Sequence, residues 1–254
     1  MQVIVAEQDV RVTRRPLPVL RPWTVTVVAA CLALAASALV LAPEVRPVAP
    51  LAILGILVAL LVADSLNLHL EFRRHGLTIS AQELAFVVAL VEVGPFWTAV
   101  ARAAAVGVVC LAQRFARSKA GFNVAVAVLE VCTATVALRL LPIGGIESPT
   151  TWISYVVAIS AATAVGGALT ALAIIVTQGY PGRALWTSLF LPVVMVSPVA
   201  VVVGLAVLLL VSVTAWAWLL IVPLVGGLAL VYRRLGSVIR EGRTLEAVYE
   251  FVVI

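Results

Sequence analysis

Ionisable side chains inside long apolar segments are the residues of this sequence most capable of chemistry. A charged group in hydrocarbon is costly, so within a membrane it marks either a function or a structural ion pair. The apolar segments hold six such residues: Asp64, Glu83, Glu92, Arg102, Glu130 and Arg139. A set of this kind can bind a small ligand or an ion, or it can hold helices in register.

Arg102 and Glu130 have the most informative spacing of this set. Arg102 precedes the basic segment Arg114–Lys119, and Glu130 follows it, at about the same separation in sequence. If the two flanking segments form an antiparallel helical hairpin, both side chains lie at the same depth. The sequence therefore predicts an Arg102–Glu130 ion pair near mid-membrane, which serves either to fix helix register or to sense a ligand or an ion.

The other polar residues are predicted to lie nearer to the two membrane faces. Glu92 is expected close to the outer end, within reach of Arg139 or of water, and these two complete the intramembrane polar network. The predicted interfacial polar residues on the inner side are Asp64, His69, Arg73, Arg74, Glu83 and Asn123. The two arginines of this set are expected to neutralise its two carboxylates.

Neither a metal site nor an enzyme is predicted. His69 and His75 are six residues apart and are expected to be solvated loop side chains. The three cysteines lie inside apolar runs without metal-ligand spacing, and we expect them to pack as small apolar groups: Cys31, Cys110 and Cys132. We assign no catalytic residue and expect no cofactor. The sequence has no P-loop, no G-x-S-x-G motif and no H-E-x-x-H motif.

The composition requires a membrane environment for the elements that carry these residues. Of 254 residues, 63% are hydrophobic and 11% are charged, and the mean hydropathy is +1.18. Soluble proteins have about 25% charged residues, and here the deficit extends along the whole chain. The sequence predicts an all-α polytopic membrane protein with the lipid bilayer as a partner. Nucleic acid is excluded as a partner because the net charge of +5 is spread between apolar runs.

Eight apolar segments approach the roughly 20 helical residues that cross a bilayer. The predicted spans are Trp23–Ala42, Val48–Leu66, Ala81–Val93, Pro95–Leu111, Phe122–Leu141, Trp152–Val176, Trp186–Val211 and Ala215–Tyr232. The third and fourth are short and are divided by Gly94-Pro95, so a re-entrant pair would reduce the count to six. Gly166-Gly167 predicts close helix packing in the sixth segment.

The distribution of basic residues predicts the orientation and the domain boundaries. An even number of crossings places most of the 17 basic residues on one side, which puts both termini in the cytoplasm. Residues 1–22 form a cytoplasmic arm, residues 23–232 the bundle and residues 233–254 a cytoplasmic linker or signalling helix. Alternating apolar and polar residues at about 66–80 predict a short β-hairpin at the cytoplasmic interface.

The C-terminal segment has the spacing of a short coiled-coil seam. The residues of this predicted signalling helix are Leu235, Val238, Leu245, Tyr249 and Val252. Such a seam leaves a homodimer open as a partner arrangement. The apolar end Phe251–Ile254 favours a longer native product or a partner that covers it.

Four segments resemble the N-terminal multi-span region of bacterial cyclic-di-GMP signalling proteins of the GGDEF/EAL type. These segments are His69–Glu83, Gly94-Pro95 with Ala101-Arg102, Lys119–Ala125 with Glu130, and Arg243–Phe251. The resemblance implies a location in the bacterial inner membrane. It also implies a membrane region that leads through a short helix into cytoplasmic GAF, GGDEF and EAL domains. Those catalytic domains are absent from this chain, so their activity is not assigned to it.

The sequence thus predicts a membrane-embedded sensory or input module. A small, lipidic or physical stimulus would act through the last span on a cytoplasmic output, expected to be cyclic-di-GMP signalling through an attached domain or a partner protein. One alternative is a small-solute permease or the substrate-binding subunit of a transporter. Another is a membrane anchor or assembly protein.

Overall fold

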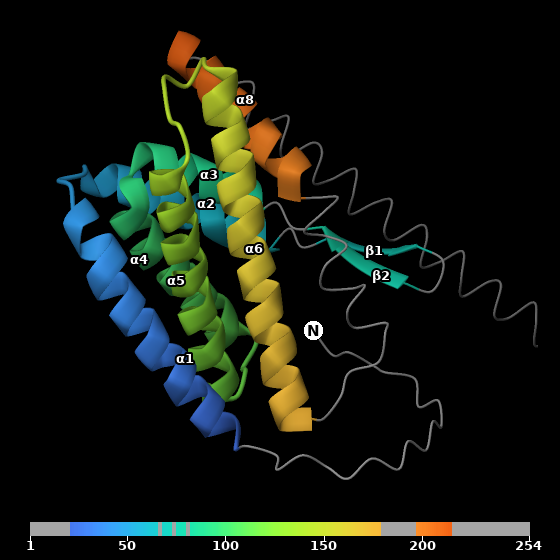
Figure 1. Cartoon of the computed structure of the whole chain (residues 1–254). Helices are drawn as coiled ribbons and strands as arrows, with labels where there is room; N and C mark the ends of the chain where they lie inside the picture. Colours follow the sequence, from blue (N-terminus) through green and yellow to red (C-terminus); the bar gives the residue numbers. More distant parts are fainter. Residues whose placement is uncertain (1–20, 66–67, 73–74, 80–81, 179–196, 215–254) are drawn as a thin grey trace, which may run out of the picture.

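The computed structural model describes residues 21–65, 68–72, 75–79, 82–178 and 197–214 (Figure 1). Its helices are α1 (Pro22–Ala36), α2 (Pro50–Ser65), α3 (Gln82–Glu92), α4 (Gly94–Ala112), α5 (Arg117–Leu140), α6 (Pro149–Gln178) and α8 (Ser197–Val213). A π-helical turn, Ser37–Leu41, and a 3-10 turn, Ala42–Glu44, extend α1. Two strands, β1 (Leu68–Phe72) and β2 (His75–Ile79), lie between α2 and α3.

Four of the described helical segments are long and apolar enough to cross a membrane. They are Pro22–Glu44, Gly94–Ala112, Arg117–Leu140 and Pro149–Thr177. The helices α2 and α8 are apolar but shorter. This pattern agrees with a membrane location and with a helical bundle.

The prediction of eight spans is not supported. The helix α3 has 11 residues, which at 1.5 Å per residue is about half the thickness of the hydrocarbon core. Residues 186–196 and 215–232 of the last two predicted spans lie outside the described residues. The predicted arm up to residue 20 also lies outside them. So does the predicted signalling helix, with Leu235, Val238, Leu245, Tyr249 and Val252.

The helix α5 lies at the centre of the four long helices. It packs against α1, α4 and α6, and these helices lie side by side in Figure 1. The short helices α2 and α3 lie toward the end of the bundle where α6 begins, and α3 packs against α2, α4 and α8. Two short helices therefore occupy one part of the bundle beside helices that run its whole length.

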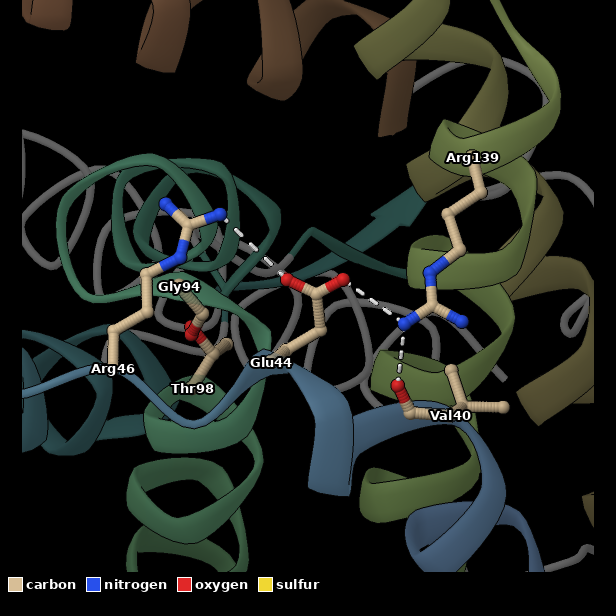
Figure 2. A network of polar contacts seen from close by, with 6 residues as sticks. All are labelled: Val40, Glu44, Arg46, Gly94, Thr98 and Arg139. Carbon is tan, nitrogen blue, oxygen red and sulfur yellow. Dashed lines mark hydrogen bonds and ion pairs between the residues drawn. The ribbon is translucent and has the colours of Figure 1, made fainter.

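Gly94 makes the break between α3 and α4. Its φ is 78°, in the left-handed region that glycine adopts without steric cost. Pro95 follows in the first turn of α4, where its missing N–H leaves no hydrogen bond unmade. The Thr98 hydroxyl donates to the Gly94 carbonyl at 2.8 Å, as Figure 2 shows. The predicted division at Gly94-Pro95 is confirmed, and its cause is this turn.

The strands β1 and β2 form an antiparallel pair. They lie within residues 66–80, where apolar and polar residues alternate in the sequence. The register places Leu70 opposite Leu77 and His69 opposite Thr78. This pair connects α2 to α3. Its depth relative to a membrane face stays a prediction.

The apolar core is deepest around α3, although this helix is too short to cross a membrane. Every residue of α3 from Ala85 to Leu90 is buried. In contrast, α1 and its extension expose large apolar side chains such as Leu34 and Leu39, at 70% and 77%. An exposed apolar surface of this kind suits lipid contact. The helix α3 is thus an interior element, so a charged residue in its first turn lies close to the core.

Candidate functional site

Arg102 is the centre of a charged cluster inside the bundle. It lies near the middle of α4 and is only 5% exposed. Its Nη2 donates to Oε2 of Glu130, which lies in the middle of α5. The Arg102–Glu130 ion pair expected from the hairpin spacing is therefore present in the structure.

Gly166 on α6 makes room for the Glu130 carboxylate. A Cβ atom built on Gly166 would overlap Glu130 Oε1, so any larger residue would displace the carboxylate or separate the two helices. The sequence indicates this glycine as a packing position. It does not indicate that the group packed against it is an acid.

Phe86 on α3 covers the guanidinium of Arg102, the cationic partner of the ion pair. The Arg102 Cζ atom lies 4.3 Å from the centroid of the Phe86 ring, and Phe86 is 1% exposed. A desolvated cation–π contact of this kind is worth about 2 kcal/mol. Phe86 follows Glu83 by one helical turn, so both side chains lie on the same side of α3.

Two further carboxylates belong to the cluster. Arg102 exerts a Coulomb attraction on Asp64, near the end of α2, and on Glu83, in the first turn of α3. Both carboxylates also act on Glu130 by charge repulsion. The helices α2, α3, α4 and α5 thus each contribute one ionisable side chain to a single cluster.

The interfacial placement of Asp64 and Glu83 stays a prediction. Both lie in the electrostatic field of Arg102, Asp64 near the end of α2 and Glu83 in the first turn of α3. Arg73 and Arg74 lie outside the described residues, and the side chain of His69 is likewise not described. Asn123 is elsewhere, with its amide 3.8 Å from Cys110 Sγ.

Hydrogen bonding in the cluster is incomplete among the described residues. Arg102 Nε and Glu83 Oε2 are buried and have no hydrogen-bond partner there. One is a donor and the other an acceptor. In the described part of the chain, the cluster has three carboxyl groups and one guanidinium, so these charges do not cancel when all four groups are ionised.

A second ionic network joins the segment after α1 to the end of α5 (Figure 2). Arg139 Nη2 donates to Glu44 Oε1 at 2.9 Å and to the Val40 carbonyl at 2.8 Å. Glu44 Oε2 also lies 3.7 Å from Arg46. Since Arg46 is 72% exposed and Arg139 42% exposed, this network is worth at most about 1 kcal/mol.

Arg139 is thus part of a network, but its carboxylate partner is Glu44. Glu92 is exposed at the end of α3. Sequence reasoning missed Glu44 as a site residue. Its position two residues before Arg46, at the predicted outer end of the first span, was the available signal.

Two apolar grooves flank α5 and are separate from the charged cluster. One, of about 190 Å³, lies between α1, α5 and α6. The other, of about 400 Å³, lies between α1, α4 and α5. None of the four charged residues of the cluster lines either groove.

Comparison with known proteins identifies no relative. No protein-family model, no curated protein and no solved structure matches this chain.

Proposed function

We propose that this chain is a membrane-embedded input module of a bacterial signalling system. The charged cluster is the element that a stimulus perturbs, and the C-terminal part of the chain conveys the change to a cytoplasmic output. The observation that carries this proposal is the incomplete hydrogen bonding around the buried Arg102–Glu130 pair. A pair that served only as a structural link would be stabilised by satisfying its remaining donors and acceptors.

A contiguous set of contacts supports transmission from the cluster toward the C-terminus. Glu83 and Phe86 place α3 against Arg102. Val87, which directly follows Phe86, packs against Gly204 of α8, where an added Cβ would overlap it. Because this packing is tight, a shift of α3 displaces α8. A bias of a few kcal/mol between two arrangements is sufficient for a switch.

Cytoplasmic termini fit the positions of the basic residues, and the bacterial inner membrane is part of the proposal through the sequence resemblance. The start of α1, the end of α4 and the start of α5 lie at one end of the bundle in Figure 1. Arg21, Arg114, Arg117 and Lys119 belong to these ends, as expected for a cytoplasmic face. The proposal of a cyclic-di-GMP output rests on the sequence resemblance, whose segments include both Arg102 and Glu130.

The test is whether neutralising the cluster changes the environment of the C-terminal segment. A nitroxide is attached to Val238→Cys, in a background without the three native cysteines, and its EPR spectrum is recorded in lipid nanodiscs. Glu130→Gln should alter the spectrum, because it removes one side of the Arg102 pair. Glu92→Gln, which changes an exposed glutamate, is the matched control and should leave the spectrum unchanged. Identical spectra for the two variants would refute transmission.

The second candidate function is a small-solute permease or a substrate-binding subunit of a transporter. It is favoured by α2 and α3, two short helices whose Asp64 and Glu83 reach the interior cluster. Transporters use such interrupted helices to form binding sites near mid-membrane. Uptake of a labelled solute into proteoliposomes, abolished by Glu130→Gln and retained by Glu92→Gln, would establish this function in place of the first.

A further inference from the structure

Arg102 faces carboxylates on two different helices and pairs with one of them. Its Nη2 is bonded to Glu130 of α5. Its Nε has no partner among the described residues, and Glu83 Oε2 of α3 also has none. The Phe86 ring, on the same side of α3 as Glu83, holds the guanidinium at 4.3 Å. The cluster therefore contains one buried donor and one buried acceptor that have no hydrogen-bond partner among the described residues.

The ionisable groups of the surrounding helices give the charge of the cluster. Asp64, Glu83 and Glu130 come from α2, α3 and α5, and Arg102 comes from α4. The helix α6 presents Gly166 to the cluster and has Tyr155 as its one ionisable residue, about three turns away. The described part of α8 has no ionisable residue. With Asp64 set aside, one proton makes Glu83, Glu130 and Arg102 neutral together.

We infer that the cluster is a proton-binding site in which Glu83 and Glu130 exchange one proton and, with it, the Arg102 guanidinium. In the first arrangement, Glu130 is ionised and paired with Arg102, the pairing that the structure has, and the proton is on Glu83. In the second arrangement, the proton has left the Glu83 oxygen and is bound to a Glu130 oxygen, while Arg102 pairs with ionised Glu83. The total charge is the same in both.

This exchange gives the proposed input module its two states, and to that extent it rests on the proposed function. Arg102 joins α4 to α5 in one state and α4 to α3 in the other. Since α3 packs tightly on Gly204 of α8, the change of partner moves the helix that leads toward the C-terminus. The ligand of the site is the proton.

Infrared spectroscopy of the protein in lipid nanodiscs tests the inference. A protonated carboxyl group has a C=O stretch above the amide I band, which shifts in D2O. Spectra are recorded near neutral pH in the Asp64→Asn background, so that a band from Asp64 does not interfere. We expect this band in that background and in the control that also has Glu92→Gln.

The decisive variants act on the two glutamates and on the arginine. Glu83→Gln should remove the band, because the remaining glutamate stays ionised on Arg102. Glu130→Gln should also remove it, because Arg102 then pairs with Glu83 and keeps that group ionised. Arg102→Gln should strengthen it about twofold, because both glutamates are then neutral. All variants are first checked by size-exclusion chromatography, and Arg102→Gln provides a change of opposite sign if one glutamine variant does not fold.

Three results would overturn the inference. The first is the absence of the band near neutral pH, and the second is its persistence in Glu130→Gln. The third is a band that appears only when Na⁺ is replaced by choline, because the ligand would then be a metal cation. The EPR measurement at residue 238 separates the two proposals. If the infrared band is present but the EPR spectrum at residue 238 does not change, the proton site is retained and the input module is rejected. If the EPR spectrum changes but the band is absent, the input module is retained and the proton site is rejected.

Discussion

Removing both glutamates that compete for Arg102 should destabilise the protein far more than removing either one. Arg102 is 5% exposed, and a buried charge that has lost its partner costs about 3–5 kcal/mol. With Glu83→Gln alone, the Glu130 pair remains and the loss is about 1 kcal/mol or less, since Glu83 Oε2 makes no hydrogen bond among the described residues. With Glu130→Gln alone, Glu83 replaces the lost partner and the loss is about 1–2 kcal/mol.

The double variant leaves the guanidinium without a carboxylate, so its loss should reach about 3–5 kcal/mol. The difference from the sum of the single variants is a coupling energy of about 1–3 kcal/mol. It is measured by equilibrium unfolding in mixed detergent micelles followed by far-UV circular dichroism, in the Asp64→Asn background. Strict additivity, with both single variants folded, would refute the competition of two carboxylates for one arginine.

Three further substitutions test individual contacts by thermal unfolding. Gly166→Ala should lower the free energy of unfolding by about 1–3 kcal/mol, because its Cβ would overlap the Glu130 carboxylate. The control Gly107→Ala adds a Cβ with nothing within 4 Å and should be neutral or stabilising by up to about 1 kcal/mol. Equal effects of the two substitutions would contradict the close approach of α5 and α6. Phe86→Leu should cost about 1–3 kcal/mol, through the lost cation–π contact with Arg102 and the altered packing, and an unchanged unfolding temperature would count against that contact. Arg139→Gln should cost no more than about 1 kcal/mol and less at high salt, because its network is partly exposed; a larger, salt-independent loss would contradict this assignment.

The apolar pattern predicts most helices well because helix boundaries follow local signals. The predicted segment Pro95–Leu111 corresponds to α4 (Gly94–Ala112), and its start is marked by Gly94 and Pro95. The Arg102–Glu130 pair is also predictable, because the two residues flank a single short turn at similar distances. Both inferences need only neighbouring stretches of sequence.

Contacts between segments that are distant in the sequence are not predictable in this way. The spacing of Asp64 and Glu83 in the sequence does not indicate that either acts on Arg102. In the structure, the end of α2 and the start of α3 bring both residues into the field of Arg102. The Glu44–Arg139 contact joins residues 95 positions apart, and packing of α1 on α5 brings them together. Contacts of this kind depend on tertiary packing, which hydrophobic periodicity does not determine.

Cellular cyclic-di-GMP, measured in the organism that expresses this chain, is the most direct test of the proposed input module and of its starting point at the buried cluster. The chromosomal gene is given Glu130→Gln or, as the control, Glu92→Gln, and the nucleotide is quantified by mass spectrometry at equal protein abundance. We expect the first substitution to change the nucleotide level several-fold and the second to leave it unchanged. Equal levels in the two strains, with both proteins folded in the membrane, would contradict a signalling role for the Arg102–Glu130 cluster.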